Sequence, residues 1–118
     1  MSATPWPSDV TLDRTTRTLT IDFDDGAHFV FSAEFLRVLS PSAEVQGHSP
    51  DQKVTVPGKR NVGFVGAEEV GNYALKIIFD DRHDSGLYTW QALYQMGLNH
   101  DSLWQGYLDE LAAKGLQR

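Results

Sequence analysis

The sequence predicts an α+β fold: an antiparallel β-rich domain, a meander plus further strands, with a short helix and two C-terminal helices. Early in the chain apolar and polar residues alternate, which is the period of a half-buried strand. Late in the chain apolar residues recur at helical spacing, with Leu103, Tyr107 and Leu111 on one face. The 118 residues suit a single hydrophobic core. We therefore expect one domain over residues 9–115, preceded by an extended arm at residues 1–8.

The meander is predicted from three short strands. Residues 10–12 and 19–23 alternate in polarity, and a polar link joins them. The dipeptide Asp25-Gly26 predicts a hairpin turn because glycine accepts a positive φ, and residues 28–31 supply the third strand. Trp6 stands between two prolines and is either a loose tail residue or an anchor; we favour the anchor because exposed tryptophan is uncommon.

A short helix is predicted after the meander. Ser32 can cap it by accepting a hydrogen bond from a free backbone N–H, and Ser40-Pro41 ends it. The stretch from residue 41 to residue 61 is rich in proline and contains one possible strand, residues 54–56. Such long irregular regions are usually functional or mobile.

The second half of the chain predicts further strands and the two helices. The strands are expected at residues 61–65 and 73–79, with a short one at residues 87–88. Thr89 can cap the following helix, and Gly97 is expected to close it as a left-handed C-cap.

Composition excludes several classes of function. The formal net charge is −6, which disfavours nucleic acid as a partner because phosphate binding needs a basic face. There is no cysteine, so disulfides, thiolate metal sites and cysteine nucleophiles are excluded. No apolar run is long enough to span a bilayer and no signal peptide is recognisable, so we expect a cytoplasmic protein with no membrane partner.

Two sequence blocks carry a resemblance to a known family. They are Leu36-Arg37-Val38-Leu39-Ser40-Pro41-Ser42 and Phe79-Asp80-Asp81-Arg82-His83-Asp84-Ser85-Gly86-Leu87-Tyr88-Thr89-Trp90. In this order they resemble the gamma-butyrobetaine hydroxylase-like N-terminal domain family, over about residues 7–111. The resemblance implies a mixed, β-rich fold with helices. This family occurs as small free-standing bacterial proteins of uncharacterised function, as a domain preceding 2-oxoglutarate dioxygenase domains, and appended to some Mrp-type iron–sulfur carrier ATPases.

The resemblance also identifies positions where related hydroxylases hold zinc through three Cys and one His. Here they fall at Ser40, Ser42, Val45 and His83. Structural zinc requires four strong donors, and a serine hydroxyl is a poor one. We therefore expect no metal and no cofactor, and expect hydrogen bonds among Ser40, Ser42 and His83 in their place.

These observations predict a non-catalytic accessory or recognition domain that binds a protein partner or a small ligand. The resemblance suggests a link to iron–sulfur cluster handling or to an oxygenase. No nucleophile motif or phosphate loop is present, so we assign no catalytic residue. The contact surface is expected to combine the loop of residues 40–60 with the turn at residues 80–86. The candidate contact residues are Arg37, Ser40, Ser42, His83, Asp84, Tyr88 and Trp90.

Two alternatives remain open from the residues alone. The chain can instead be a metal-dependent binder or small enzyme that uses His83 with Asp80 and Asp84, since carboxylates orient imidazole and raise its basicity. Arg37 is a charge inside an otherwise apolar helix, so it must reach an acidic partner or solvent. A structural ion pair is its first interpretation, and contact with a partner protein is the second.

Overall fold

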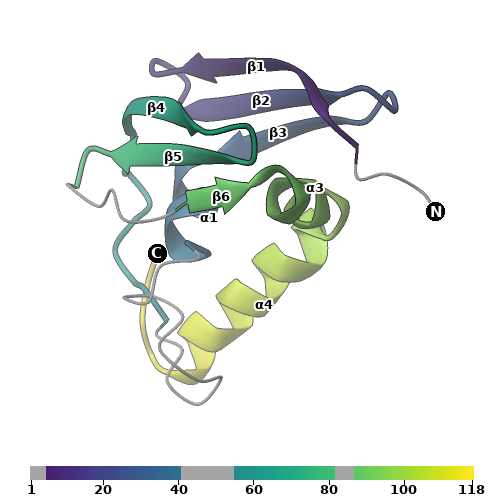
Figure 1. Cartoon of the computed structure of the whole chain (residues 1–118). Helices are drawn as coiled ribbons and strands as arrows, with labels where there is room; N and C mark the ends of the chain where they lie inside the picture. Colours follow the sequence, from purple (N-terminus) through teal and green to yellow (C-terminus); the bar gives the residue numbers. More distant parts are fainter. Residues whose placement is uncertain (1–4, 41–54, 82–86) are drawn as a thin grey trace.

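The computed structural model describes residues 5–40, 55–81 and 87–118, and it has the predicted α+β architecture (Figure 1). Two antiparallel three-stranded sheets, ordered β1-β2-β3 and β4-β5-β6, are accompanied by helices. The elements are β1 (Pro7–Asp13), β2 (Thr18–Phe23), β3 (His28–Ser32), α1 (Ala33–Val38), β4 (Phe64–Val70), β5 (Ala74–Phe79), β6 (Leu87–Thr89), α3 (Trp90–Leu98) and α4 (His100–Ala113).

The first sheet is the predicted meander. Leu19 and Ile21 of β2 point into the core, and Leu12 and Val10 pair with them across β1. Gly26 adopts a φ of +92° in the turn before β3, as the Asp25-Gly26 dipeptide predicts. The backbone of Trp6 is anchored by two hydrogen bonds with Asp24, although its ring is 50% exposed.

The second sheet differs from the sequence prediction at its first strand. β4 begins at Phe64 rather than residue 61, because a turn closed by the Val62 N–H on the Lys59 carbonyl precedes it (3.1 Å). Residues 55–56, predicted as part of a strand, lie in irregular backbone. They are held by α4 instead: Thr55 donates to Glu110 (3.1 Å), and the Val56 carbonyl accepts from the Tyr107 hydroxyl (2.6 Å).

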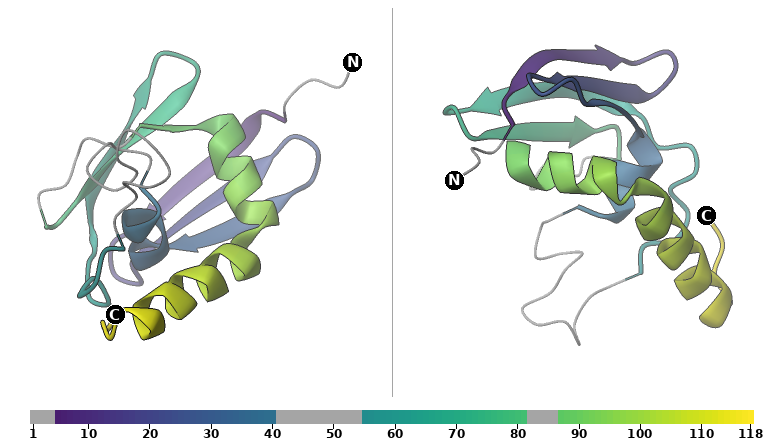
Figure 2. Two further views of the ribbon diagram at one scale, coloured as in Figure 1. Left: turned by 90° about the horizontal axis from the view of Figure 1, so that it is seen from below. Right: turned by 90° about the vertical axis from the view of Figure 1, so that its right-hand side faces the viewer.

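The two long helices follow the second sheet directly. Thr89 caps α3 as predicted, accepting from the Ala92 N–H at 3.0 Å. Gly97 is not the C-cap: it lies within the helix, which ends at Leu98, and its missing side chain lets Phe29 of β3 approach. α3 and α4 then run along the β3 side of the meander (Figure 2). Within the described residues no helix has the length and apolar character needed to cross a membrane.

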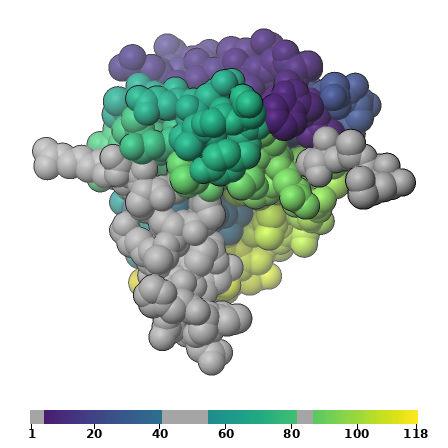
Figure 3. Space-filling view, viewed as in Figure 1, coloured from purple at the N-terminus to yellow at the C-terminus, as the bar shows by residue number. Residues whose placement is uncertain are grey.

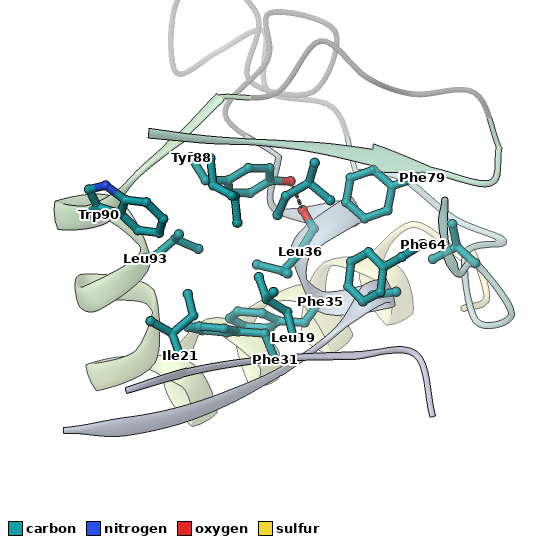
Figure 4. Close-up of a cluster of buried hydrophobic side chains, with 14 of the residues drawn as sticks. Leu19, Ile21, Phe31, Phe35, Leu36, Phe64, Phe79, Tyr88, Trp90 and Leu93 are labelled. Atoms are coloured by element: carbon teal, nitrogen blue, oxygen red, sulfur yellow. Dashed lines mark hydrogen bonds between the residues drawn. The ribbon is translucent and has the colours of Figure 1, made fainter. Parts of the chain in front are cut away.

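The core lies between the two sheets. Sheet residues from both sides meet there with α1 and the start of α3, as Figure 4 shows for Phe31, Phe79, Tyr88 and Trp90. The start of β1, the β4–β5 hairpin and α3 meet on one face of the molecule (Figure 3).

Candidate functional site

Helix α1 places two charged side chains inside the protein. All six of its residues are buried, and Glu34 and Arg37 are only 6% and 4% exposed. Ser32 begins the helix as predicted, by accepting the Phe35 N–H at 3.0 Å. Buried charges are costly unless they are paired. Glu34 receives two hydrogen bonds from Arg118, from Nε at 3.0 Å and Nη2 at 2.7 Å.

The other buried charge belongs to a cluster formed by Arg37, Asp81 and Lys59. Arg37 Nε lies 2.8 Å from Asp81 Oδ2, and Lys59 Nζ lies 2.6 Å from the same oxygen. The side chains of Asp81 and Lys59 are only 20% and 24% exposed, so water screens these interactions weakly. The structural ion pair expected for Arg37 is therefore confirmed. The cluster joins α1, the end of β5 and the segment before β4.

Backbone contacts fix the geometry around this cluster. The Asp80 N–H donates to the Gly63 carbonyl at 2.9 Å, which attaches the end of β5 to the segment carrying Lys59. A Cβ at Gly63 would stand 3.0 Å from Asp80 Oδ2, so a side chain there would require the exposed Asp80 carboxylate to shift slightly. The described ends of the two segments that the sequence assigned to the contact surface thus meet, through Lys59 and Asp81.

A buried hydrogen bond holds α1, the helix that carries Arg37, against β6. The Tyr88 hydroxyl donates to the Leu36 carbonyl at 2.5 Å, and the whole Tyr88 side chain is buried (Figure 4). Burial raises the pKa of Tyr88 strongly, while a side-chain hydrogen bond with Ser40 and the charge of Arg37 act in the opposite direction. The phenol therefore stays neutral at physiological pH and attaches β6 to α1.

The structure brings three of the predicted site residues together. Arg37, Ser40 and Tyr88 are neighbours, but their side chains are 4%, 0% and 0% exposed, so they lie beneath the surface and stabilise it. Trp90 lies elsewhere, at the start of α3. The remaining predicted residues, Ser42, His83 and Asp84, lie outside the described residues. Their contacts, including the predicted convergence with Ser40, stay predictions.

The residues at the zinc positions of the related hydroxylases do not suit zinc. They are three side chains without a thiol, Ser40, Ser42 and Val45, and the imidazole of His83. Ser40 is the one described, and its hydroxyl is buried in a hydrogen bond with Tyr88. A neutral alcohol committed to a phenol is a poor ligand for zinc.

Acidic residues elsewhere are explained by local contacts. Asp25 accepts from the Ala27 N–H and from the Tyr94 hydroxyl, Asp24 accepts from Trp6, and Asp22 pairs with His28. In the part of the chain that the structure describes, no three His, Asp or Glu side chains form a group that could hold a metal. The use of Asp80 with His83 and Asp84 is a prediction on residues that are mostly outside that part.

A hollow of about 370 Å³, lined largely by apolar side chains, lies next to Arg60, the residue that follows Lys59 of the cluster. Its floor is the end of α4 and the residues after it, including Leu108, Leu111 and Leu116. Arg60 and Arg118 border it, and the charge of Arg118 is already compensated by Glu34. Arg60 is exposed and directly follows Lys59. Sequence reasoning included Arg60 in the contact loop but missed the hollow, because the residues after α4 carry no motif.

A second region was also missed by sequence reasoning. Two adjoining hollows of about 330 and 280 Å³ share Trp6 and Trp90 in their walls. Tyr73 lines one of them and Glu69 the other. These residues come from the arm, the β4–β5 hairpin and α3. Of these residues, Trp90 alone was among the predicted contact residues, and Trp6 was predicted only as an anchor.

Comparisons with known proteins agree with this architecture. Two proteins with structures determined by NMR in solution share 50% and 47% sequence identity with the chain, with TM-scores of 0.85 and 0.83. The first comparison covers 98% of this chain and 91% of the other, and the second covers 100% and 88%. A crystal structure of a protein of unknown function from Acidithiobacillus ferrooxidans, assigned to the DUF971 family, is 30% identical with a TM-score of 0.62, covering 77% and 91%. A search of functionally curated proteins finds no match.

The match to a family model agrees with the two sequence blocks. The model describes the N-terminal part of gamma-butyrobetaine hydroxylase-like proteins, and it matches residues 10–94. That range contains most of β1, the strands β2 to β6, α1 and the Arg37–Asp81–Lys59 cluster. The chain belongs to the gamma-butyrobetaine hydroxylase-like N-terminal domain family.

Proposed function

We propose that this protein is a cytoplasmic, non-catalytic recognition domain that binds a protein partner. The contact is made through the Arg60 surface, which we define as Lys59, Arg60, Asp81 and the apolar hollow that ends at Leu116. The partner classes to consider first are those suggested by the family's domain combinations, namely iron–sulfur carrier ATPases and oxygenases.

One observation supports this proposal: the exposed cation Arg60 borders a hollow lined largely by apolar side chains and directly follows Lys59 of the charged cluster. Protein interfaces commonly combine an apolar centre with a polar rim, and arginine is enriched in them. Arg60 and Arg118 border the hollow, and the ion pairs of Asp81 hold Lys59 in place. A surface that is already ordered loses little entropy when it binds.

The charge distribution favours an acidic contact on the partner. The chain carries a net charge of −6, whereas Arg60 is an exposed cation at the edge of the hollow. Complementary charge increases the association rate and selects the orientation of the partner. We therefore expect the opposing surface to present carboxylates around an apolar side chain.

Charge reversal at Arg60 tests the proposal. Arg60→Glu should abolish recovery of the partner by affinity purification from the native cells, because it places a carboxylate at the rim of the hollow. Arg14→Glu is the matched control, since Arg14 is exposed in the β1–β2 turn and the net charge changes equally. Equal recovery with both variants would contradict the proposal.

Crosslinking identifies the surface independently of affinity. An amine-reactive reagent should join the partner to Lys59 or Lys114 and leave Lys76 of β5 unlinked. The Lys114 Nζ donates a hydrogen bond to Thr55 Oγ1 at 2.8 Å. Crosslinks confined to Lys76 would place the partner on the second sheet and exclude the Arg60 surface.

A further inference from the structure

Aromatic residues contribute to the lining of the two adjoining hollows. Trp6 and Trp90 line both, and Tyr73 lines the smaller. Trp90 is only 5% exposed and forms the floor, whereas Trp6 and Tyr73 are 50% and 55% exposed and form the walls. Figure 3 shows the start of β1, the β4–β5 hairpin and α3 meeting on this face.

Backbone hydrogen bonds fix the three aromatic residues. The Trp6 N–H donates to Asp24 at 3.2 Å, and its carbonyl accepts from the Asp24 N–H at 2.8 Å. The Trp90 N–H donates to the Tyr73 carbonyl at 3.2 Å, which attaches α3 to the β4–β5 hairpin. The backbone of all three aromatic residues is therefore held in place, although the side chains of Trp6 and Tyr73 are exposed.

Glu69 adds a negative charge to the same region. Its partner across β4 and β5 is Leu75, which in turn pairs with Tyr88, and both of those side chains are buried. Since residues paired across antiparallel strands share a face, Glu69 belongs to the inward face of the sheet. It is nevertheless exposed, because the core ends there and the hollow begins.

The neighbouring Glu68 provides a contrast. It pairs with Lys76 on the outward face, where a cross-strand charge pair needs no further explanation. Asp9 also lines the larger hollow, so carboxylates contribute to its wall from both β1 and β4. Among the described residues that line the two hollows there is no lysine or arginine.

We propose that the two adjoining hollows, together called the aromatic hollow, bind an arginine side chain of a partner protein. A guanidinium stacks on the faces of tryptophan and tyrosine rings, and its planar fork of donors fits a carboxylate such as that of Glu69. Lysine offers a compact, strongly hydrated charge and fits such a slot less well. This site is separate from the Arg60 surface and does not depend on the function proposed there.

Elsewhere in this protein, an aromatic ring and a carboxylate already bind an arginine side chain together. Arg118 places its guanidinium carbon 5.2 Å from the centre of the Trp104 ring and binds Glu34 through two hydrogen bonds. An aromatic face beside a carboxylate thus holds an arginine within the chain itself. Around the two hollows, Trp6, Tyr73 and Glu69 present such groups to solvent.

An NMR titration tests the proposal with the whole chain. The probe is the capped peptide acetyl-Gly-Arg-Gly-amide, and its control carries citrulline, the neutral analogue of arginine. The indole N–H signals of Trp6 and Trp90 should shift with a dissociation constant on the order of 1 mM. The signal of Trp104 should remain in place, because Arg118 already covers that ring.

Two variants separate the carboxylate from general charge. Glu69→Gln should weaken binding of the arginine peptide about fivefold, because the charge-assisted hydrogen bonds are lost. Glu68→Gln removes the same charge from the outward face and should leave affinity unchanged. Tyr73→Leu should also weaken binding. Equal shifts with the citrulline peptide, or equal affinity of the two glutamate variants, would overturn the assignment.

Discussion

Two glycines inside helices should respond to alanine in opposite ways. Gly97 lies in α3 and Gly106 in α4. In a helix interior, replacing glycine by alanine normally stabilises by roughly 0.5–1 kcal/mol because the unfolded chain loses freedom. A Cβ at Gly106 meets nothing within 4 Å, so Gly106→Ala should gain that amount.

At Gly97, close packing makes the expected effect of alanine on stability unfavourable. A Cβ there would lie 2.4–2.5 Å from three ring atoms of Phe29, far inside contact distance. The Phe29 ring cannot easily move away, because it packs against Phe23, Phe31 and Tyr94 at centroid distances of 5.9, 6.2 and 5.5 Å. Overpacking of this kind costs about 1–3 kcal/mol. After the helix gain is subtracted, Gly97→Ala should destabilise by about 1–2 kcal/mol.

Thermal and chemical unfolding measure this difference. Gly97→Ala should lower Tm by roughly 5–10 °C, whereas Gly106→Ala should raise it by roughly 2–5 °C. The double variant Gly97→Ala with Phe29→Leu should be less destabilised than the sum of its parts, because the smaller side chain relieves the clash. Stabilisation by Gly97→Ala, of the size seen for Gly106→Ala, would refute the close packing of α3 on β3.

Two further predictions concern charge and pH. Asp81→Asn should destabilise by about 2–3 kcal/mol in urea unfolding, because it removes the carboxylate that Arg37 and Lys59 both contact, although the partial exposure of Asp81 reduces the loss. Asp101→Asn, at a fully exposed carboxylate, should change the midpoint much less. Burial, helped by the charge of Glu34, raises the pKa of Tyr107 to about 12, so the folded state keeps a proton that the unfolded state loses above pH 10. The resulting stability is complete below pH 10 and falls between pH 10 and 12 by up to about 1.4 kcal/mol per pH unit. Tyr107→Phe should show a shallower decline over that range, and an unchanged slope would contradict the assignment.

Local patterns predicted most of the fold. Polarity alternation identified the meander, and Ser32 and Thr89 both cap helices as expected because capping depends on a few adjacent residues. Gly97 was assigned wrongly for the opposite reason. A glycine is needed at position 97 because the ring of Phe29, which is distant in sequence, packs against it. No local signal distinguishes a glycine needed for packing from one that ends a helix.

The candidate sites were predictable only in part. A charge in an apolar helix implied a partner for Arg37, and that partner, Asp81, lies in one of the two recognised blocks. The aromatic hollow could not be predicted because it joins three segments that only tertiary structure brings together. Glu69 is the clearest example: its inward orientation follows from the strand register with Leu75, and the sequence did not predict that β4 extends to residue 70.

Burial determines how binding experiments on this domain should be read. Substitution of Arg37 or Tyr88 removes contacts from the core, so stability falls before any surface is altered. A binding defect that arises in this way should diminish on cooling to a temperature at which the variant is folded. Arg60 is exposed, so the defect expected for Arg60→Glu should persist at every temperature at which the domain is folded. Temperature dependence therefore distinguishes residues that support the surface from those that contact the partner.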